Sequence, residues 1–235
     1  MSVSIIVPVL NEAPLLRPFL SHLRQRAVGA EIVVADGGSS DGTSDHAQGF
    51  CDQLVVSEAS RATQMNAGAR AARGDILWFV HVDAKVPWGC LEEIERIMDD
   101  PNVAGGFFRI QLPPAYIYRL TDSFAHYAGI LLRMRCGDHG IFCRRAAFLA
   151  VNGFPKVPLM EDVEFFRRLR RHGRVRYSRK RILASPRRYE TIGPVRLTLA
   201  YGLIAALYVF GIPLKKLASI YKRTCFTRCG TDFSG

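Results

Sequence analysis

Three carboxylates stand at positions where a folded chain could use them for chemistry. Asp36 follows an apolar run and opens the Gly- and Ser-rich stretch 36–43, Asp83 follows another apolar run, and Asp162 opens a helical pattern. A carboxylate at a strand end suits Mg²⁺ or Mn²⁺ bridging two phosphates, and a carboxylate in a cleft can act as a general base. Each acid alone also fits a plainer interpretation, because acids often cap turns and helix starts.

Further polar residues flank the same apolar runs. Asn11 and Glu12 follow the first run, and Arg61 begins an Ala-rich helical stretch. Arginine suits recognition of a phosphate or a base, although it also fits an ordinary exposed helix start. Asp138 and His139 are candidate metal ligands or acceptor contacts, although a polar turn explains them too.

The runs that must position these residues alternate between strand and helix patterns. Predicted strands cover residues 3–9, 31–36, 54–57 and 76–82. Predicted helices cover about 11–27, then 63–73 with Gly74 ending it, then Pro87 to 98. This order predicts an α/β fold, a mostly parallel sheet with helices on both faces. Ligands of such sheets bind beyond the carboxyl ends of the strands, where Asp36 and Asp83 are expected.

A second pattern begins after Pro101. Expected elements are a strand over 103–112 with a kink at its two glycines, a helix over 116–134, a short strand over 140–143, a helix over 160–171 and a strand within 174–184. The chain is expected to be helical from there to about Tyr221. We therefore predict a domain over 1–190 and a basic helical extension over 191–235.

The net charge of +11 is unevenly distributed along the chain. Residues 1–166 carry a net charge of −4 and residues 167–235 carry +15. This asymmetry indicates an anionic partner, such as nucleic acid, acidic lipid or a nucleoside diphosphate, or else a solvated basic surface. Nucleic acid is not expected, because the basic residues lack the interleaved aromatics of a recognisable binding module.

Six scattered cysteines predict reduced thiols, and no signal peptide precedes the first strand, so we expect a cytoplasmic protein. Residues 197–214 carry no charge, and they are bracketed by Arg196 and Lys215. A spanning helix needs roughly 20 apolar residues, and Pro213 would break this one. The pattern favours a helix lying on a membrane surface or packed in a homodimer. Basic residues over 187–223 suit anionic headgroups on the inner face of the cell membrane, which would make a lipid-linked acceptor natural.

The order and spacing of the motifs are more specific than any one of them. The sequence Pro8-Val-Leu-Asn-Glu is followed by the stretch 36–43, by Arg61 with Asn66-x-Gly, by His81-x-Asp, by a Gly-Gly-x-Phe and by Glu161-Asp. This series resembles the family 2 glycosyltransferases, which have the GT-A (Rossmann-like) fold, over about residues 3–180. Residues 60–68, 81–84 and 137–140 resemble a small bacterial subgroup in which a basic helical tail follows.

The resemblance implies a nucleotide site built from residues near the first strands. Pro8, Asn11 and Glu12 would line the nucleoside pocket, Asp36 would hold the base, and Arg61 would contact base or phosphate. The family usually has Asp-Asp-Gly-Ser where this chain has Gly37 after its first Asp.

The resemblance also implies the catalytic groups. Asp83 would bind the metal as the final Asp of the family's Asp-x-Asp motif, whose first position is His81 here, with His139 as a further candidate ligand. Asp162 would be the general base. Acceptor or phosphate contacts are assigned to His81, Glu161 and Asp138.

These assignments predict an inverting, divalent-metal-assisted glycosyltransferase. It would move a sugar from a UDP- or GDP-sugar to an acceptor hydroxyl. The alternatives are a non-catalytic basic protein that binds nucleic acid or a membrane surface, and a sugar-phosphate nucleotidyltransferase. The latter would need a Gly-rich, Arg- or Lys-bearing loop after the first strand, where this chain has Asn11-Glu12-Ala-Pro.

Overall fold

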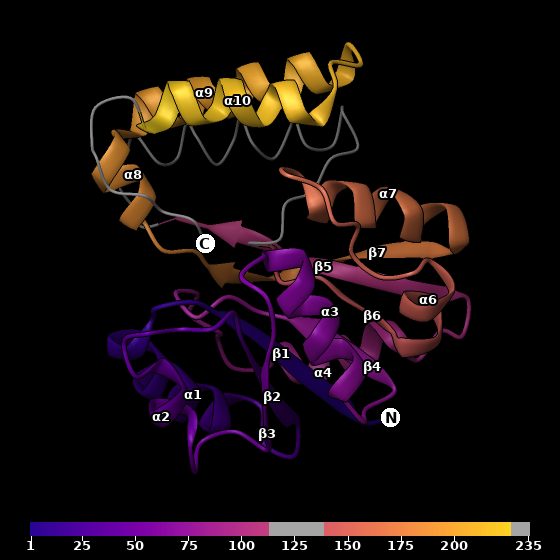
Figure 1. Cartoon of the computed structure of the whole chain (residues 1–235). Coiled ribbons are helices and arrows are strands. Elements are labelled where there is room, and N and C mark those ends of the chain that lie inside the picture. Colours follow the sequence, from indigo (N-terminus) through magenta and orange to yellow (C-terminus); the bar gives the residue numbers. More distant parts are fainter. Residues whose placement is uncertain (113–138, 227–235) are drawn as a thin grey trace.

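The fold is that of a computed structural model of the 235-residue chain, which describes residues 1–112 and 139–226 (Figure 1). The helix predicted over 116–134 and the candidate residue Asp138 lie outside these described residues.

Seven strands of the described residues form one sheet in the order β3-β2-β1-β4-β6-β5-β7. Their bounds are β1 Val3–Val9, β2 Glu31–Asp36, β3 Gln53–Val56, β4 Ile76–Phe79, β5 Val103–Gln111, β6 Phe142–Arg144 and β7 Arg174–Leu183. The pairs are parallel except those of β6, which runs antiparallel to both β4 and β5. The predicted mostly parallel sheet is confirmed, and the register of β5 against β7 shifts beside the two glycines, near the predicted kink.

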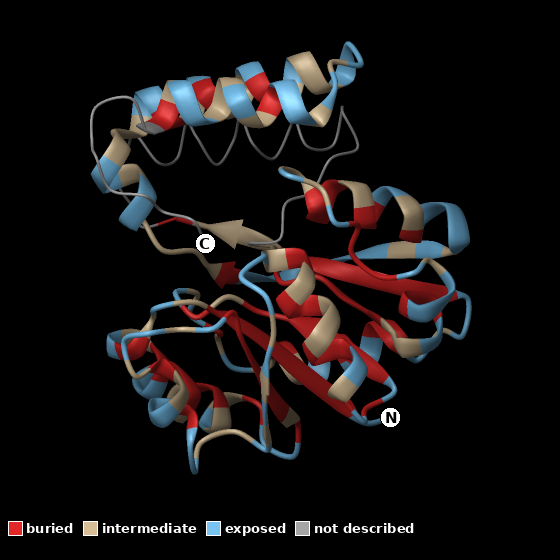
Figure 2. Cartoon of the chain, viewed as in Figure 1, coloured by how far each residue is buried: buried red, intermediate tan, exposed pale blue. Residues whose placement is uncertain are grey.

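Helices cover both faces of the sheet, as predicted. On one face lie α1 (Ala13–Arg26), α2 (Thr43–Ala47) and α4 (Cys90–Met98); on the other lie α3 (Arg61–Ala71), α6 (Arg145–Ala150) and α7 (Glu161–His172). Successive strand side chains point to opposite faces, so Ile5 packs with the α1 and α4 core while Ile6 packs with the α3 and α7 core. Figure 2 shows the central strands buried along their length.

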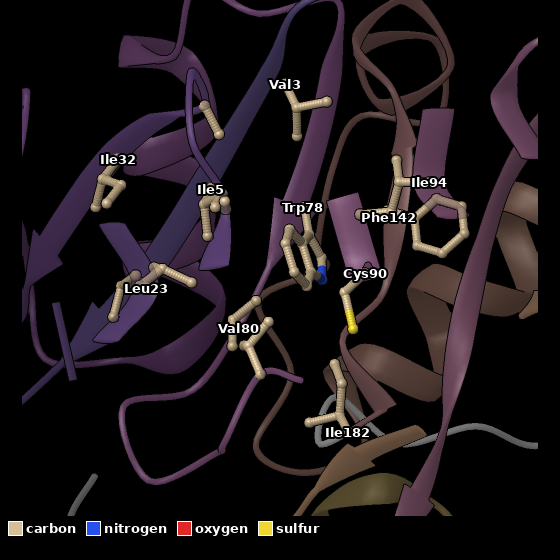
Figure 3. Close-up of a cluster of buried hydrophobic side chains, with 14 of the residues drawn as sticks. Val3, Ile5, Leu23, Ile32, Trp78, Val80, Cys90, Ile94, Phe142 and Ile182 are labelled. Carbon is tan, nitrogen blue, oxygen red and sulfur yellow. The ribbon is translucent and has the colours of Figure 1, made fainter. Parts of the chain in front are cut away.

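The core beneath α1 and α4 is centred on a fully buried tryptophan. Trp78 of β4 lies among Val80, which directly follows β4, Phe142 of β6, and Cys90 and Ile94 of α4 (Figure 3). Its ring centroid is 5.5 Å from that of Phe108. This packing fixes the central strands, whose carboxyl ends therefore have a defined position.

The carboxyl ends of β1 and β4 diverge at the point where the strand order reverses. β1 has β2 on one side and β4 on the other, so the chain changes direction across the sheet between them. The pairing of β1 with β4 ends at Ile6 and Phe79, and Val80 N donates to Ile6 O at 3.0 Å. Pro8 follows two residues later and has no N–H with which to continue the ladder. Such a switch point is where open α/β sheets place their ligands.

Three local predictions were wrong. β4 ends at Phe79 and not at residue 82, because the chain turns there and Ala84 N donates to His81 O at 3.1 Å. α4 begins at Cys90, after Gly89, and Pro87 lies before it. α3 begins at Arg61 and ends at Ala71, so Gly74 does not end it. Gly74 is needed for a close backbone approach, since an added Cβ would lie 2.8 Å from Ser4 N.

Within the described residues, β7 is followed by α8 (Arg187–Ile192), α9 (Pro194–Val209) and α10 (Leu214–Phe226). α9 and α10 lie side by side beyond α7 and α8 (Figure 1), and they pack through Leu197, Ala200 and Cys225. The predicted break at Pro213 is confirmed, because α9 stops at Val209 and α10 starts at Leu214. The predicted domain boundary at residue 190 falls inside α8.

Among the described residues, none of the helices has the length and apolar character needed to cross a membrane. The four described cysteines, Cys51, Cys90, Cys143 and Cys225, are free thiols, as predicted. Burial raises the pKa of Cys90 to about 11.

Candidate active site

Two loops at the switch point are joined by hydrogen bonds into one polar wall. Asn11 N donates to Ser39 Oγ at 2.9 Å, and Asn11 Oδ1 accepts from Ser40 N at 3.0 Å. Glu12 N donates to Thr43 Oγ1 at 2.9 Å. The loop after β1 and the turn after β2 are therefore held together, as the predicted nucleoside pocket requires.

Asp36 organises the turn that it opens. It is only 1% exposed, and its Oδ1 accepts from Ser39 N at 3.0 Å and from Ser39 Oγ at 2.6 Å. Its Oδ2 accepts from Ser44 Oγ. These donors offset the cost of burying the carboxylate. The contact of Asp36 with a base stays a prediction, as does that of Pro8, which is buried within β1.

Gln64, which the sequence places on the same polar helix face as Arg61, is a structural support of this wall. Its side chain is buried, and Nε2 donates to Val9 O at 2.6 Å and to Ala35 O at 3.3 Å, which joins the carboxyl ends of β1 and β2. An added Cβ at Gly37 would lie 3.0 Å from that Nε2. The glycine that departs from the resembled pattern thus accommodates Gln64.

A second cluster joins α3, the turn after β4 and the start of α7. Arg61 Nη2 lies 2.7 Å from His81 Nε2, and Arg61 Nε lies 3.5 Å from Glu161 Oε1. Because arginine can only donate, His81 Nε2 is the acceptor of this hydrogen bond. The residue at the first position of the resembled Asp-x-Asp motif is thus held by Arg61.

Asp162 and Glu161 form the first turn of α7 and are both largely buried. Asp162 Oδ1 accepts from Val163 N at 2.7 Å. The positive end of the helix dipole favours both carboxylates. Through Arg61, this helix start lies beside the turn that carries His81 and Asp83.

Arg187 reaches the site from α8, at the far end of the sequence. Its Nη2 and Nη1 contact the two carboxylate oxygens of Glu12 at 2.9 Å and 3.3 Å. The pKa of Arg187 is raised, first by its hydrogen bonds to Glu12 and also by the negative charges of Glu12 and Asp83. The sequence placed Arg187 only in the basic stretch facing lipid, because no local signal marks a partner 175 residues away.

The candidate metal ligands suit a hard divalent cation that is also bound by water and phosphate oxygens. Within residues 1–112 and 139–226, no group of three or more His, Cys, Asp or Glu side chains could hold a metal on its own. Asp83 is an exposed carboxylate, and a single carboxylate with phosphate oxygens and waters suits Mg²⁺ or Mn²⁺. His139 Nδ1 lies 3.1 Å from Phe108 O of β5, so its role as a ligand stays a prediction.

The chain belongs to glycosyl transferase family 2, whose family model matches residues 4–152. It is 32% identical over 111 residues to MT1568, an uncharacterized protein of Mycobacterium tuberculosis (strain CDC 1551 / Oshkosh). That match covers 45% of this chain and 35% of the relative, so the chain spans about a third of the relative's length.

Solved structures share the fold at low sequence identity. The mannosyltransferase PcManGT from Pyrobaculum calidifontis, in complex with GDP-Man and Mn²⁺, superposes with a TM-score of 0.68 at 19% identity, over 94% of this chain and 69% of that one. TarS 1–349 of S. aureus, in complex with UDP-GlcNAc, gives 0.63 at 16% identity, over 96% and 82%. The predicted GT-A fold is confirmed.

Proposed function

We propose that this chain transfers a sugar from a nucleoside-diphosphate sugar to an acceptor hydroxyl, with inversion at the anomeric carbon. One observation carries the proposal most strongly. Four separate segments of the chain bring charged residues to the switch point of the sheet. These residues are Asp83, the Glu161-Asp162 helix start, Arg61 and Arg187. Guanidinium groups, and a cation held by a carboxylate, stabilise the negative charge of a diphosphate leaving group.

The donor would lie along the wall made by residues 10–12 and 36–43. Backbone and side-chain groups there are fixed by the hydrogen bonds between the two loops. A GDP-sugar or a UDP-sugar is the proposed donor class, because structural neighbours were solved with GDP-Man and with UDP-GlcNAc. Arg61 would contact base or phosphate.

Asp83 would hold a divalent cation together with diphosphate oxygens. A cation bound there, Mn²⁺ or Mg²⁺, supplies positive charge to the leaving diphosphate. Arg187 and Arg61 would add fixed positive charge on the protein side. His81 contacts Arg61, and Asp83 is the residue of this turn that we propose as the metal ligand.

Asp162 would accept the proton of the acceptor hydroxyl as that oxygen bonds to the anomeric carbon. The bond between the anomeric carbon and the diphosphate oxygen breaks in the same displacement, and the nucleoside diphosphate leaves with the electron pair. The base and the leaving group lie on opposite sides of the carbon, which inverts its configuration.

A thermal-shift screen of nucleoside diphosphates and sugar nucleotides, with and without Mn²⁺, tests the proposed donor site. A specific ligand at a hundredfold excess over its Kd stabilises the folded state by about 2.7 kcal/mol. We expect one nucleotide to stabilise the protein selectively and in a Mn²⁺-dependent way, and Asp83→Asn to remove the dependence on Mn²⁺. The matched control Asp99→Asn, an exposed acid on α4's far end, should leave it unchanged.

Equal responses to all nucleotides, or a Mn²⁺ response that survives in Asp83→Asn, would contradict the donor site. Five expectations stay predictions, because no contact in the site bears on them. They are membrane contact over 187–223, a lipid-linked acceptor, a homodimer, a cytoplasmic location on the inner face of the membrane, and the division at residue 190.

A further inference from the structure

The outward face of α9 is apolar and exposed. Val195, Leu199, Leu203 and Phe210 are exposed by 59%, 68%, 46% and 82%, and Figure 2 shows exposed stretches along the helix. Their spacings of four, four and seven residues place them on one face of a helix. This apolar face of α9 extends from its first turn to the residue that follows its last.

The opposite face of α9 is also apolar, but it has a partner. Leu197, Ala200 and Ile204 are buried, and Leu197 and Ala200 pack with Cys225 of α10. A helix at the surface of a soluble protein normally carries polar residues on its outer side, and one that is apolar all round is normally buried. Single exposed apolar residues are ordinary, whereas a continuous apolar face indicates a binding surface.

The charges of the segment that contains α9 and α10 are of one sign. Residues 191–226 contain no Asp or Glu, and they contain Arg196, Lys215, Lys216, Lys222 and Arg223, all of them exposed. A second copy of the chain would bring the same positive charges against these, which opposes a homodimer through this face. An anionic surface complements them, and each basic residue near such a membrane adds attraction.

We propose that the α9–α10 hairpin, residues 194–226, docks on an anionic lipid bilayer. The apolar face of α9 would lie in the boundary between headgroups and acyl chains. Arg196 is on the same helix, and the cations of α10, which packs on the other side of α9, would add electrostatic attraction to the anionic surface. With 16 residues and a rise of about 1.5 Å per residue, α9 lies along the surface and is too short to span the roughly 30 Å hydrocarbon core.

The docking helix is connected to the catalytic elements at both ends. Near the end of α9, Tyr208 donates to Glu164 of α7, and Arg167 Nη1 lies 3.4 Å from Tyr208 Oη. On the other side, Arg187 of α8, the helix that precedes α9, contacts Glu12. Docking would therefore hold Asp162 and the donor site beside the bilayer. Resting on the proposed function, this predicts an acceptor hydroxyl carried by a membrane lipid.

Vesicle flotation of the full-length protein tests the docking surface. Phosphatidylcholine vesicles are compared with vesicles that also contain phosphatidylglycerol, and only the anionic vesicles should carry the protein upward. The double variant Leu199→Ser with Leu203→Ser should lower vesicle binding by at least tenfold, because it removes two apolar side chains from the face that would enter the bilayer. Lys215→Gln with Lys216→Gln should lower it on the order of tenfold. Val28→Ser, which changes an exposed apolar residue between α1 and β2, should bind as wild type does.

Absence of binding, or equal binding to both kinds of vesicle, would overturn the proposal. So would a concentration-dependent dimer in solution that Leu199→Ser with Leu203→Ser converts to monomer, because a second copy would then cover the face. The thermal-shift response to nucleotides separates the two proposals. A normal nucleotide response with failed flotation overturns the docking surface alone, and flotation without any nucleotide response overturns the donor site alone.

Discussion

The contact between Arg187 and Glu12 brings a guanidinium group from α8 to the proposed nucleotide site. A bidentate arginine–carboxylate pair fixes both partners, and Asp83 adds a negative charge nearby. A bound diphosphate would compete with Glu12 for this guanidinium. We therefore propose two roles for Arg187. It holds the loop after β1, and it attracts the leaving diphosphate.

Arg187→Ala should weaken binding of a nucleoside diphosphate about tenfold, the equivalent of roughly 1.4 kcal/mol. The change removes the positive charge and leaves Glu12 and Asp83 facing the phosphates. Isothermal titration calorimetry measures the effect. Arg188→Ala, which changes the adjacent exposed arginine, serves as the control. Equal affinity in wild type and Arg187→Ala would show that Arg187 only holds the loop.

At the scale of elements, a buried carboxylate attaches the edge strand β7 to α4. Glu93 Oε1 accepts from Ser178 Oγ and from Arg179 N, both at 3.1 Å. Arg96 contacts the two Glu93 oxygens at 2.9 Å and 3.0 Å. The pKa of Glu93 is lowered to about 2, first by the hydrogen bonds from Arg96 and then by those from Arg179 and Ser178, which outweigh its partial burial.

A depressed folded-state pKa stabilises the protein only where the carboxylate is charged. The contribution of Glu93 is fully present above its ordinary pKa of 4.5, and it is lost as the pH falls towards 2. Glu93→Gln should therefore be less stable than wild type at neutral pH, and the difference should shrink between pH 4.5 and pH 2. Urea denaturation across this range measures it, with the exposed Glu92→Gln as control. A difference that stays constant with pH would contradict the assignment.

The elements that could be predicted from the sequence are those whose apolar residues recur at a regular spacing within the element itself. β1, β2 and α1 were predicted to within two residues because their apolar residues repeat along a short segment. The end of β4 could not be predicted, since Val80 and Val82 continue the apolar run while the pairing of Lys85 with Leu183 turns the chain. In the sequence, Gly74 suggested the end of a helix. The fold shows instead that a side chain at this position would clash with Ser4.

The same limit applies to the candidate site. Asn11, Glu12, Arg61, His81 and Glu161 were all chosen from sequence, and the fold brings them to one edge of the sheet. The contacts of Arg187 with Glu12, and of Gln64 with Val9 and Ala35, could not be predicted. Their partners lie far away in the chain, and their own neighbours in sequence give no signal.

At the scale of the whole molecule, the uneven charge corresponds to two regions with different surroundings. The acidic first part builds most of the sheet and supplies the carboxylates of the site, while the basic last part forms β7, α8, α9 and α10. The two parts meet through Arg187 with Glu12 and through Tyr208 with Glu164. One end of the molecule therefore combines an acidic site with a basic, apolar-faced hairpin.

The central claim is that Asp162 activates the attacking hydroxyl in a transfer from a nucleotide sugar. The most direct measurement is release of nucleoside diphosphate from the donor that the thermal-shift screen selects, with Mn²⁺ present and water or a lipid as acceptor. Wild type should release it, with the sugar product inverted at its anomeric carbon by NMR. Asp162→Asn should bind the donor as wild type does and lose at least a hundredfold in rate. Near-normal turnover by Asp162→Asn, or retention of configuration, would contradict the account.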